Sequence, residues 1–301
     1  MQFYTIEFPL AGLGADAVEA ALLASGAQSI TYLDGGDEPV LEPRVGEMRL
    51  WRDTVVRALF DAGNNAAGNL ERLAASLGPQ ITGSARIEKV EDRVWERIWL
   101  ADWTSMRFGA RLWVCPTSAP APGAPDAIVV RLDPGLAFGT GTHPTTALCL
   151  EALDGLDLVG KKVLDYGCGS GILCIAAIKL GAASAIAVDL DPQALSACGQ
   201  NAYRNGVAAQ LSTVAPGTAL PPCDCVVANI LASTLLELLP LLSDACKAGG
   251  ELLLSGVLSS QSDKVAAAYA PQFELLRTTH RDDWCCLHAR RRAPVPASGA
   301  R

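Results

Sequence analysis

The pattern of apolar and polar positions separates the chain into two regions, each with its own order of predicted strands and helices. In the first ninety residues, short alternating runs flank two amphipathic stretches, which predicts the order β-α-β-β-α-β of a ferredoxin-like α+β domain. The expected strands are residues 3–8, 28–33, 48–51 and 85–90, and the expected helices are 15–25 and 70–77. The alternative is that this region forms only a second layer on the main domain.

From residue 128 onward, apolar runs of strand length alternate with stretches of helical period. This order predicts a doubly wound, mostly parallel sheet of the Rossmann-like α/β class. The expected strands are 128–132, 162–166, 185–188, 224–228, 251–255, 274–279 and 284–289, and the expected helices are 145–153, 172–180, 192–205, 235–242 and 263–269. The helix at 192–205 has clear end signals, because Asp191 can cap it, Pro192 suits its first turn and Gly206 can close it.

A linker helix is predicted between these regions, because Trp95, Trp99 and Trp103 recur every four residues and form one stripe. An aromatic stripe of this kind is typical of packing between domains. We therefore expect a ferredoxin-like domain at 1–90, a linker helix at 91–108 and an α/β domain at 109–290. The last residues, 291–301, lack an apolar period and are expected to form a disordered basic tail.

The charge balance limits the classes of partner. The 301 residues carry 24 Lys and Arg against 32 Asp and Glu, a formal net charge of −8. This balance argues against direct readout of nucleic acid, because such binding depends mainly on cationic side chains at phosphates. The first ninety residues hold 12 acidic and 7 basic side chains, which suits a basic protein partner. The alternative is that the acidic excess only keeps the domain soluble.

The ten cysteines contain no Cys-x-x-Cys spacing, so the sequence predicts no metal site. We expect the thiols to be reduced and mostly buried. The first basic residue is Arg44, which argues against the positively charged start of a secretory signal. The most apolar stretch, 171–188, is interrupted by Lys179 and Gly181 and is not typical of a membrane span. These features favour a cytoplasmic protein with no membrane partner.

The strongest local signal is a glycine-rich turn between a predicted strand and helix, with Gly167, Gly169 and Gly171 in the pattern G-x-G-x-G. Glycines there let the backbone approach a ligand closely at the start of a helix. Asp165 precedes the turn, and Asp189 follows the next strand, where an acid accepts hydrogen bonds from ribose hydroxyls in nucleoside-binding folds. The sequence therefore predicts a nucleoside-containing cofactor.

The spacing of the glycines favours one cofactor over another. Dinucleotide-binding enzymes use G-x-G-x-x-G, with a pyrophosphate at the helix start. The shorter turn with Asp165 before it is the pattern of enzymes that use S-adenosylmethionine, whose cationic aminoacyl arm suits a nearby carboxylate. A nicotinamide-dependent dehydrogenase is the alternative. On this reading Asp165, Gly167, Gly169 and Asp189 are candidate cofactor-binding residues.

A second motif spans residues 132–146 and contains several glycines around Phe138. The glycines suit a mobile flap that closes over a ligand, and Phe138 is a candidate cofactor contact. Pro144 is expected to begin a helix, which places Thr145 and Thr146 in the first turn beside the cofactor. His143 is a candidate base or a hydrogen-bonding support residue.

A third signal is Asn229, which follows an apolar strand at its carboxyl end, where open α/β sheets bind their ligands. Its amide can accept hydrogen bonds from a substrate amine while the apolar neighbours exclude water. The alternative is that Asn229 only ends the strand and caps the next helix.

Five segments together resemble the bacterial PrmA family, whose members methylate ribosomal large-subunit protein eleven. They are residues 133–146, 167–173, 189–192, 229–232 and 283–285. The resemblance runs from the first strand to about Ala289, and the flap motif is its most specific part. It implies S-adenosylmethionine as the cofactor and a class I methyltransferase domain behind a small substrate-recognition domain on a linker helix.

The resemblance also implies an activity and site residues. The family methylates lysine ε-amines and the N-terminal α-amine of one ribosomal protein, and Thr145, Thr146, Gly167, Asp189 and Asn229 would contact the cofactor. We expect direct in-line methyl transfer to a neutral amine, with Asn229 as the catalytic residue. The alternatives are a non-catalytic ribosome-associated module, or methylation of another protein or of a small-molecule amine. An RNA acceptor is the poorer choice, because the chain has no basic patch.

Overall fold

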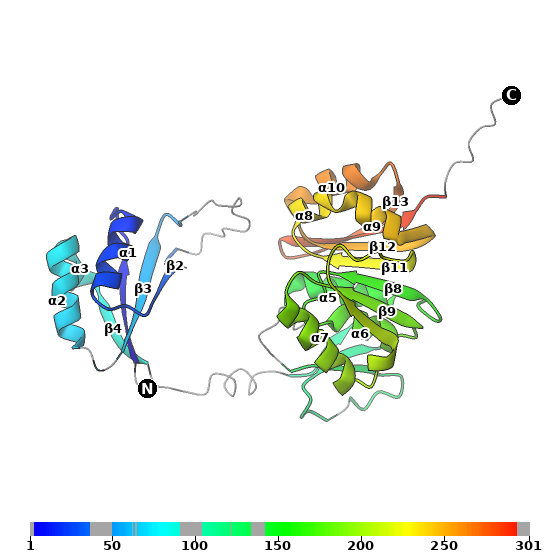
Figure 1. Ribbon diagram of the computed structural model, residues 1–301, viewed down its shortest axis with the longest axis horizontal. Helices are drawn as coiled ribbons and strands as arrows, with labels where there is room; N and C mark the ends of the chain where they lie inside the picture. The colour runs from blue at the N-terminus through cyan, green and yellow to red at the C-terminus, as the bar shows by residue number, and fades with distance from the viewer. Residues whose placement is uncertain are drawn as a thin grey trace. The chain divides into compact units, whose positions relative to one another are not determined.

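The computed structural model describes residues 3–36, 50–61, 63, 65–90, 104–120, 122–133 and 142–293. The chain divides into two compact units, Met1–Trp95 and Glu96–Arg301 (Figure 1). Among the described residues, no helix has both the length and the apolar character that crossing a bilayer requires.

The N-terminal unit is a four-stranded antiparallel sheet with helices. Its elements are β1 (Phe3–Pro9), α1 (Ala15–Ala24), β2 (Ser29–Asp34), β3 (Thr54–Asp61), α2 (Ala66–Leu77), α3 (Gln80–Ser84) and β4 (Arg86–Val90). The strand order is β2-β3-β1-β4, and every neighbouring pair is antiparallel. Alternate residues of β1 and β3 form the core with α1 and α2, as a sheet covered on one face requires. This arrangement confirms the ferredoxin-like prediction.

One strand of this unit lies elsewhere than predicted. A third strand is predicted at 48–51, whereas β3 begins at Thr54. The buried positions Val56, Ala58 and Phe60 alternate with more exposed ones along β3, so the two-residue period that marks the strand lies after Trp51. Residues 50 and 51 are not in a strand, so the prediction is wrong there, while residues 48 and 49 lie outside the described residues.

The C-terminal unit is built around a seven-stranded sheet with the order β10-β9-β8-β11-β12-β14-β13. The strands are β8 (Lys162–Tyr166), β9 (Ser184–Val188), β10 (Leu211–Val214), β11 (Cys223–Asn229), β12 (Cys246–Leu258), β13 (Phe273–Arg281) and β14 (Trp284–Arg291). The first five in this order run parallel, and β14 pairs antiparallel with both β12 and β13. The predicted doubly wound, mostly parallel sheet is confirmed.

Helices cover both faces of this sheet (Figure 1). One core contains residues of α5 (Pro144–Asp154), α6 (Ile172–Lys179) and α7 (Pro192–Arg204). The other core contains residues of α8 (Ala232–Glu237), α9 (Leu239–Ala245) and α10 (Ser262–Tyr269). Because both faces are buried, the middle of β11 is a continuous apolar run at residues 225–228. Two single 3-10 turns, Ala208–Gln210 and Ser259–Gln261, complete the unit.

Several elements differ from the prediction. The strand expected at 128–132 is β7 (Ile128–Arg131), which joins β5 (Met106–Phe108) and β6 (Leu112–Cys115) in a separate three-stranded sheet. The end of the linker helix expected at 91–108 is therefore a strand, while 91–103 lie outside the described residues.

The single helix expected at 235–242 is divided into α8 and α9, because Pro240 in the first turn of α9 cannot continue a helix. Strand β14 continues to Arg291, into the expected tail, whose residues 294–301 are not described.

The parallel strands place their carboxyl ends along one edge of the sheet. The residues at or just after the ends of β8, β9 and β11 are Tyr166, Asp189 and Asn229. Tyr166 pairs with Val188 on one side and with Ala228 on the other, which fixes these strand ends next to one another. The predicted polar groups therefore meet at a single edge.

Candidate active site at the carboxyl edge of the sheet

The glycine-rich turn connects β8 directly to α6, and its shape requires glycine. Gly167, Gly169 and Gly171 have φ angles of 80°, 51° and 79°, a region that side chains disfavour. A Cβ on Gly167 would lie 2.3 Å from Ile230 Cγ2. The amides of Gly167 and Cys168 donate to the Val188 carbonyl at 2.8 and 3.0 Å. The turn is thus held tightly between the ends of β9 and β11.

Asp165 lies beneath this turn and is fully buried. Its Oδ2 accepts a hydrogen bond from the Cys174 amide at 3.2 Å, whereas its Oδ1 has no hydrogen-bond partner among the described residues. Burial raises the pKa of this carboxyl to about 7. A buried carboxylate with one free oxygen is a group that a positively charged ligand would stabilise.

Asp189 uses both of its carboxylate oxygens to shape the same turn. Oδ2 accepts from the Gly169 amide at 2.8 Å, and Oδ1 accepts from the Asp191 amide at 3.0 Å. Asp191 in turn caps α7 by accepting from the Gln193 amide at 2.8 Å, as predicted. Asp189 is half-buried, so its remaining lone pairs face a partly open site. Its predicted contact with a ribose stays a prediction.

Thr145 and Thr146 lie in the first turn of α5, and Pro144 begins that helix, as expected. His143 caps it, because its Nδ1 lies 2.7 Å from Thr145 Oγ1 and accepts from the Thr145 amide at 3.4 Å. Burial lowers the pKa of His143, which favours the neutral ring that can accept these bonds. This geometry supports His143 as a hydrogen-bonding residue that positions the helix.

Asn229 is connected to the start of α5 by a hydrogen bond from its Nδ2 to Thr146 Oγ1, with a length of 3.3 Å. Leu231, not Asn229, is the N-cap residue of α8, so the alternative capping role is wrong. Thr145 and Thr146 are almost fully buried, while Asn229 is half-buried. Among the three side chains, Asn229 is therefore the one most exposed to solvent.

Two residues on β12 that the sequence did not point to support the site. Ser255 Oγ donates to the Thr145 and Cys285 carbonyls, with distances of 3.3 and 3.0 Å. Gly256 has a φ of 77°, and a Cβ there would lie 2.3 Å from the Ile230 carbonyl oxygen. These small residues let the end of β11 approach β12 and α5. Their signal in the sequence is a Ser-Gly pair that interrupts the apolar run at 252–258.

Cysteines pack below the turn and have a structural role there. Cys174 and Cys198 have their Sγ atoms 3.9 Å apart, and a Cβ on Gly171 would lie 2.4 Å from Cys198 Sγ. All ten cysteines are buried and free, as predicted. Burial raises the pKa of the Cys174 thiol, so this thiol is an apolar packing group and not a nucleophile. No metal-binding cluster occurs among the described residues.

Two exposed apolar residues border the site. Leu190 follows Asp189 and is 85% exposed, and Leu231 lies two positions after Asn229 and is 51% exposed. An exposed leucine beside a polar group offers an apolar surface to a ligand ring. Phe138 and its neighbours at 134–141 lie outside the described residues, so the predicted flap contact stays a prediction.

The chain is similar to a known protein family and to individual relatives that carry the same name. The family described as ribosomal protein L11 methyltransferase (PrmA) matches residues 2–292. The ribosomal protein L11 methyltransferase of Pectobacterium carotovorum subsp. carotovorum (strain PC1) is 50% identical over 295 residues, which cover 97% of this chain and 100% of the relative. The protein of the same name from Sodalis glossinidius (strain morsitans) is 51% identical over 298 residues, with coverages of 97% and 100%.

A solved structure shows the same similarity. The crystal structure of ribosomal protein L11 methylase from Lactobacillus delbrueckii subsp. bulgaricus is 33% identical, with a TM-score of 0.58. The match covers 64% of this chain and all of that chain.

Proposed function

The chain belongs to the ribosomal protein L11 methyltransferase (PrmA) family, and from this membership we propose that it transfers methyl groups from S-adenosylmethionine to amino groups of ribosomal protein L11. The acceptors are lysine ε-amines and the N-terminal α-amine. The observation that carries the proposal is the match of about 50% identity over the full length of relatives with this activity in their names. Because the substrate is a ribosomal protein, we place the enzyme in the cytoplasm.

The edge of the sheet fits S-adenosylmethionine. The free Oδ1 of buried Asp165 suits the positive charge of the aminoacyl arm, and the tight turn at Gly167 and Gly169 lets the backbone approach that arm. Asp189 has the chemistry to accept the ribose hydroxyls. Leu190 offers an apolar surface for the base. We assign the cofactor to these residues, and to Thr145, Thr146 and Phe138 as its further contacts.

When bound, the cofactor supplies a methyl group activated by a sulfonium. The protein then has to hold a neutral amine in line with that group and exclude water. Asn229 is suited to hold the amine: its Nδ2 is engaged with Thr146, and no hydrogen bond among the described residues engages its Oδ1. The Oδ1 can accept a hydrogen bond from the amine.

A lysine amine has a pKa near 10.4 in water and is mostly protonated at neutral pH. Desolvation beside the uncharged Asn229 lowers that pKa and frees the lone pair. The released proton passes to water.

The N-terminal unit is the proposed recognition domain for the substrate. The first ninety residues have an acidic excess of 12 to 7, and an acidic surface attracts a basic ribosomal protein. Neither direct nucleic-acid readout nor membrane binding is required. If this attraction guides binding, raising the salt concentration will raise the KM for L11 and leave the affinity for the cofactor unchanged.

Asn229→Ala tests the proposed catalytic residue. We expect turnover of L11 methylation to fall at least about 100-fold, as for the loss of one positioning group in an active site, with little change in thermal stability. The measurement is transfer of labelled methyl groups to purified L11, together with calorimetry of cofactor binding. The matched control is Asn65→Ala, an exposed asparagine of the N-terminal unit, which leaves turnover unchanged. Unaltered turnover in Asn229→Ala rejects the role.

A further inference from the structure

A cavity lies away from the proposed cofactor edge, between the C-terminal half of α5 and the β13–β14 hairpin. Its volume is about 190 Å³, which is smaller than the roughly 300–1,000 Å³ of pockets that hold drug-sized ligands. Leu148, Ala152 and Leu156 of α5 and its following turn form an apolar wall. Arg277, Thr279 and His288 of the hairpin form a polar wall opposite. The cavity is therefore amphipathic and has room only for a small molecule.

The polar wall is created by a bulge in β13. Leu275 pairs with Ala289, but after the register shift Arg277 pairs with His288 and Thr279 with Cys286. Leu275 consequently lies with Ala289 on the opposite face of the sheet, at the pocket beside α10. Without the bulge, Arg277 would share that face, because residues two apart in a strand point the same way. The bulge thus directs Arg277 into the cavity.

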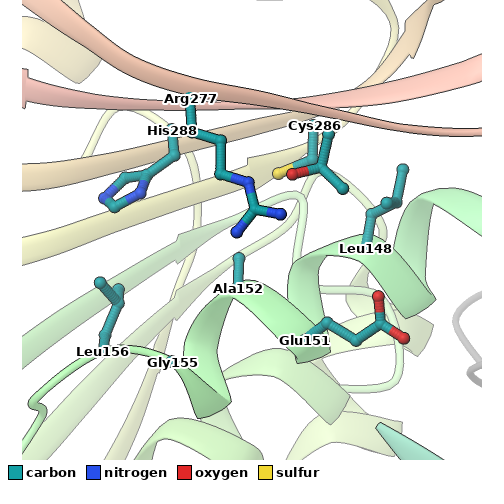
Figure 2. A pocket seen from close by; sticks show the side chains of 9 residues that line it. Leu148, Glu151, Ala152, Gly155, Leu156, Arg277, Cys286 and His288 are labelled. Carbon is teal, nitrogen blue, oxygen red and sulfur yellow. The ribbon is translucent and has the colours of Figure 1, made fainter. Parts of the chain in front are cut away.

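Arg277 has no counterion among the described residues that surround the cavity. The carboxylate of Glu151 pairs with Arg281 at 2.8 Å, and that of Glu251 pairs with His288 at 2.7 Å and with Arg290 at 2.9 Å. Within the part of the chain that the structure describes, Arg277 takes part in no ion pair or hydrogen bond. Figure 2 shows its guanidinium extending from the hairpin toward Ala152.

We propose that this cavity binds a small organic carboxylate. Its anionic group is held by the Arg277 guanidinium, which can donate two parallel hydrogen bonds, with the Thr279 hydroxyl beside it. Its apolar body packs on Leu148, Ala152 and Leu156. Both neighbouring carboxylates are already paired, so the ligand provides the negative charge that Arg277 lacks.

The test uses benzoate as the probe, with the full-length protein and isothermal titration calorimetry. Benzamide has the same shape without the charge, and inorganic phosphate has charge without an apolar body. We expect saturable millimolar binding of benzoate that is at least tenfold tighter than that of benzamide or of phosphate. Arg277→Gln should weaken benzoate binding at least tenfold, and Ala152→Leu, which fills the cavity without altering its charge, should abolish it.

Lys264→Gln is the control, because it removes one exposed positive charge from α10 and should leave benzoate binding unchanged. Thermal unfolding of each variant verifies that it is folded, and none of these positions belongs to the proposed cofactor site. Absence of benzoate binding to the wild-type protein overturns the proposal. Equal binding to wild type, Arg277→Gln and Ala152→Leu also overturns it, since the anion then binds elsewhere.

Discussion

The two units of the chain differ in where positive backbone φ angles occur. Among the described residues of the N-terminal unit, positive φ angles occur only at positions outside the strands and helices: Ala11, Gly12, Gly26 and Gly78. In the C-terminal unit, they also occur in connecting turns, but three of them fall close together in the turn after β8, at Gly167, Gly169 and Gly171. Two more lie inside strand β12, at Gly249 and Gly256.

Unsatisfied polar groups follow the same division. In the described part of the chain, the buried side-chain oxygens without a hydrogen-bond partner belong to Asp154, Asp165 and Ser243, all in the C-terminal unit. A buried carboxylate oxygen without a hydrogen-bond partner lowers the stability of a fold, whereas glycine adopts positive φ angles at little steric cost. The glycine turn and the free oxygen of Asp165 lie together at the edge proposed to bind the cofactor, where a ligand can use them. The N-terminal unit is therefore built for packing, whereas the C-terminal unit carries an unsatisfied carboxylate oxygen beside a turn that requires glycine.

The largest expected effect comes from Gly256→Ala. The new Cβ meets the Ile230 backbone at 2.3 Å, so the backbone has to move. We expect a loss of about 3 kcal/mol or more, from the left-handed conformation and from overpacking together. Hydrogen exchange measured by mass spectrometry should show lost protection in β11 and β12, with unchanged protection in β1 and β3.

Gly249→Ala is the matched control in the same strand. Its φ is 74°, but nothing lies within 4 Å of the added Cβ. Only the conformational cost of about 1–2 kcal/mol is expected. Equal losses in the two variants would contradict the role of close approach at Gly256.

The second-largest expected effect is on the pH dependence of the free energy of unfolding, to which Asp165 contributes. Burial raises the pKa of this carboxyl from its ordinary 3.8 to about 7. Between these values the folded state holds a proton that the unfolded chain has released, so the free energy of unfolding falls as pH rises and levels off above about pH 7. The slope from this group approaches about 1.4 kcal/mol per pH unit. Asp165→Asn should remove about 2–3 kcal/mol of pH dependence between pH 5 and 7.

Urea unfolding of the cofactor-free protein at several pH values measures this slope. Asp224→Asn is the control: partial burial raises the pKa of Asp224, but the Lys162 amide and the Lys247 ammonium lower it by more. Since the pKa of Asp224 lies below its ordinary value, this group does not titrate between pH 5 and 7, and the slope there should persist. A slope in Asp165→Asn equal to that of the wild type would show that another group titrates.

Much of the fold was predictable because local signals were strong. Asp191, Pro192 and Gly206 mark the ends of α7, and the strand at 162–166 was placed correctly because apolar residues run directly into the glycines. The errors have local causes as well. Strands of three or four residues such as β5 and β10 contain too few positions for a period to appear, and Pro240 was not treated as a helix break.

The position of the candidate site in the fold was predictable for the residues that lie in sequence motifs. Asp165, Asp189 and Asn229 follow or end strands, and parallel topology brings them to one edge. Ser255 and Gly256 were not found, because their roles depend on contacts with Thr145 and Ile230, which are far away in the sequence. The functions of these residues follow from tertiary packing, which no local pattern contains.

The smallest expected effects come from deleting one methylene group in the apolar core of each unit. Ile6 of β1 and Ile175 of α6 are both fully buried, so Ile6→Val and Ile175→Val should each cost about 1 kcal/mol. Because each residue packs within its own unit, Ile6→Val should reduce exchange protection in β1 and β3 alone, with cofactor affinity unchanged. Ile175→Val should reduce protection around α6 and weaken cofactor binding slightly, since α6 begins at the glycine turn. If Ile6→Val weakened cofactor binding as much as Ile175→Val, the two units would share their stability, and the contrast between a packing unit and a unit that holds the proposed cofactor site would fail.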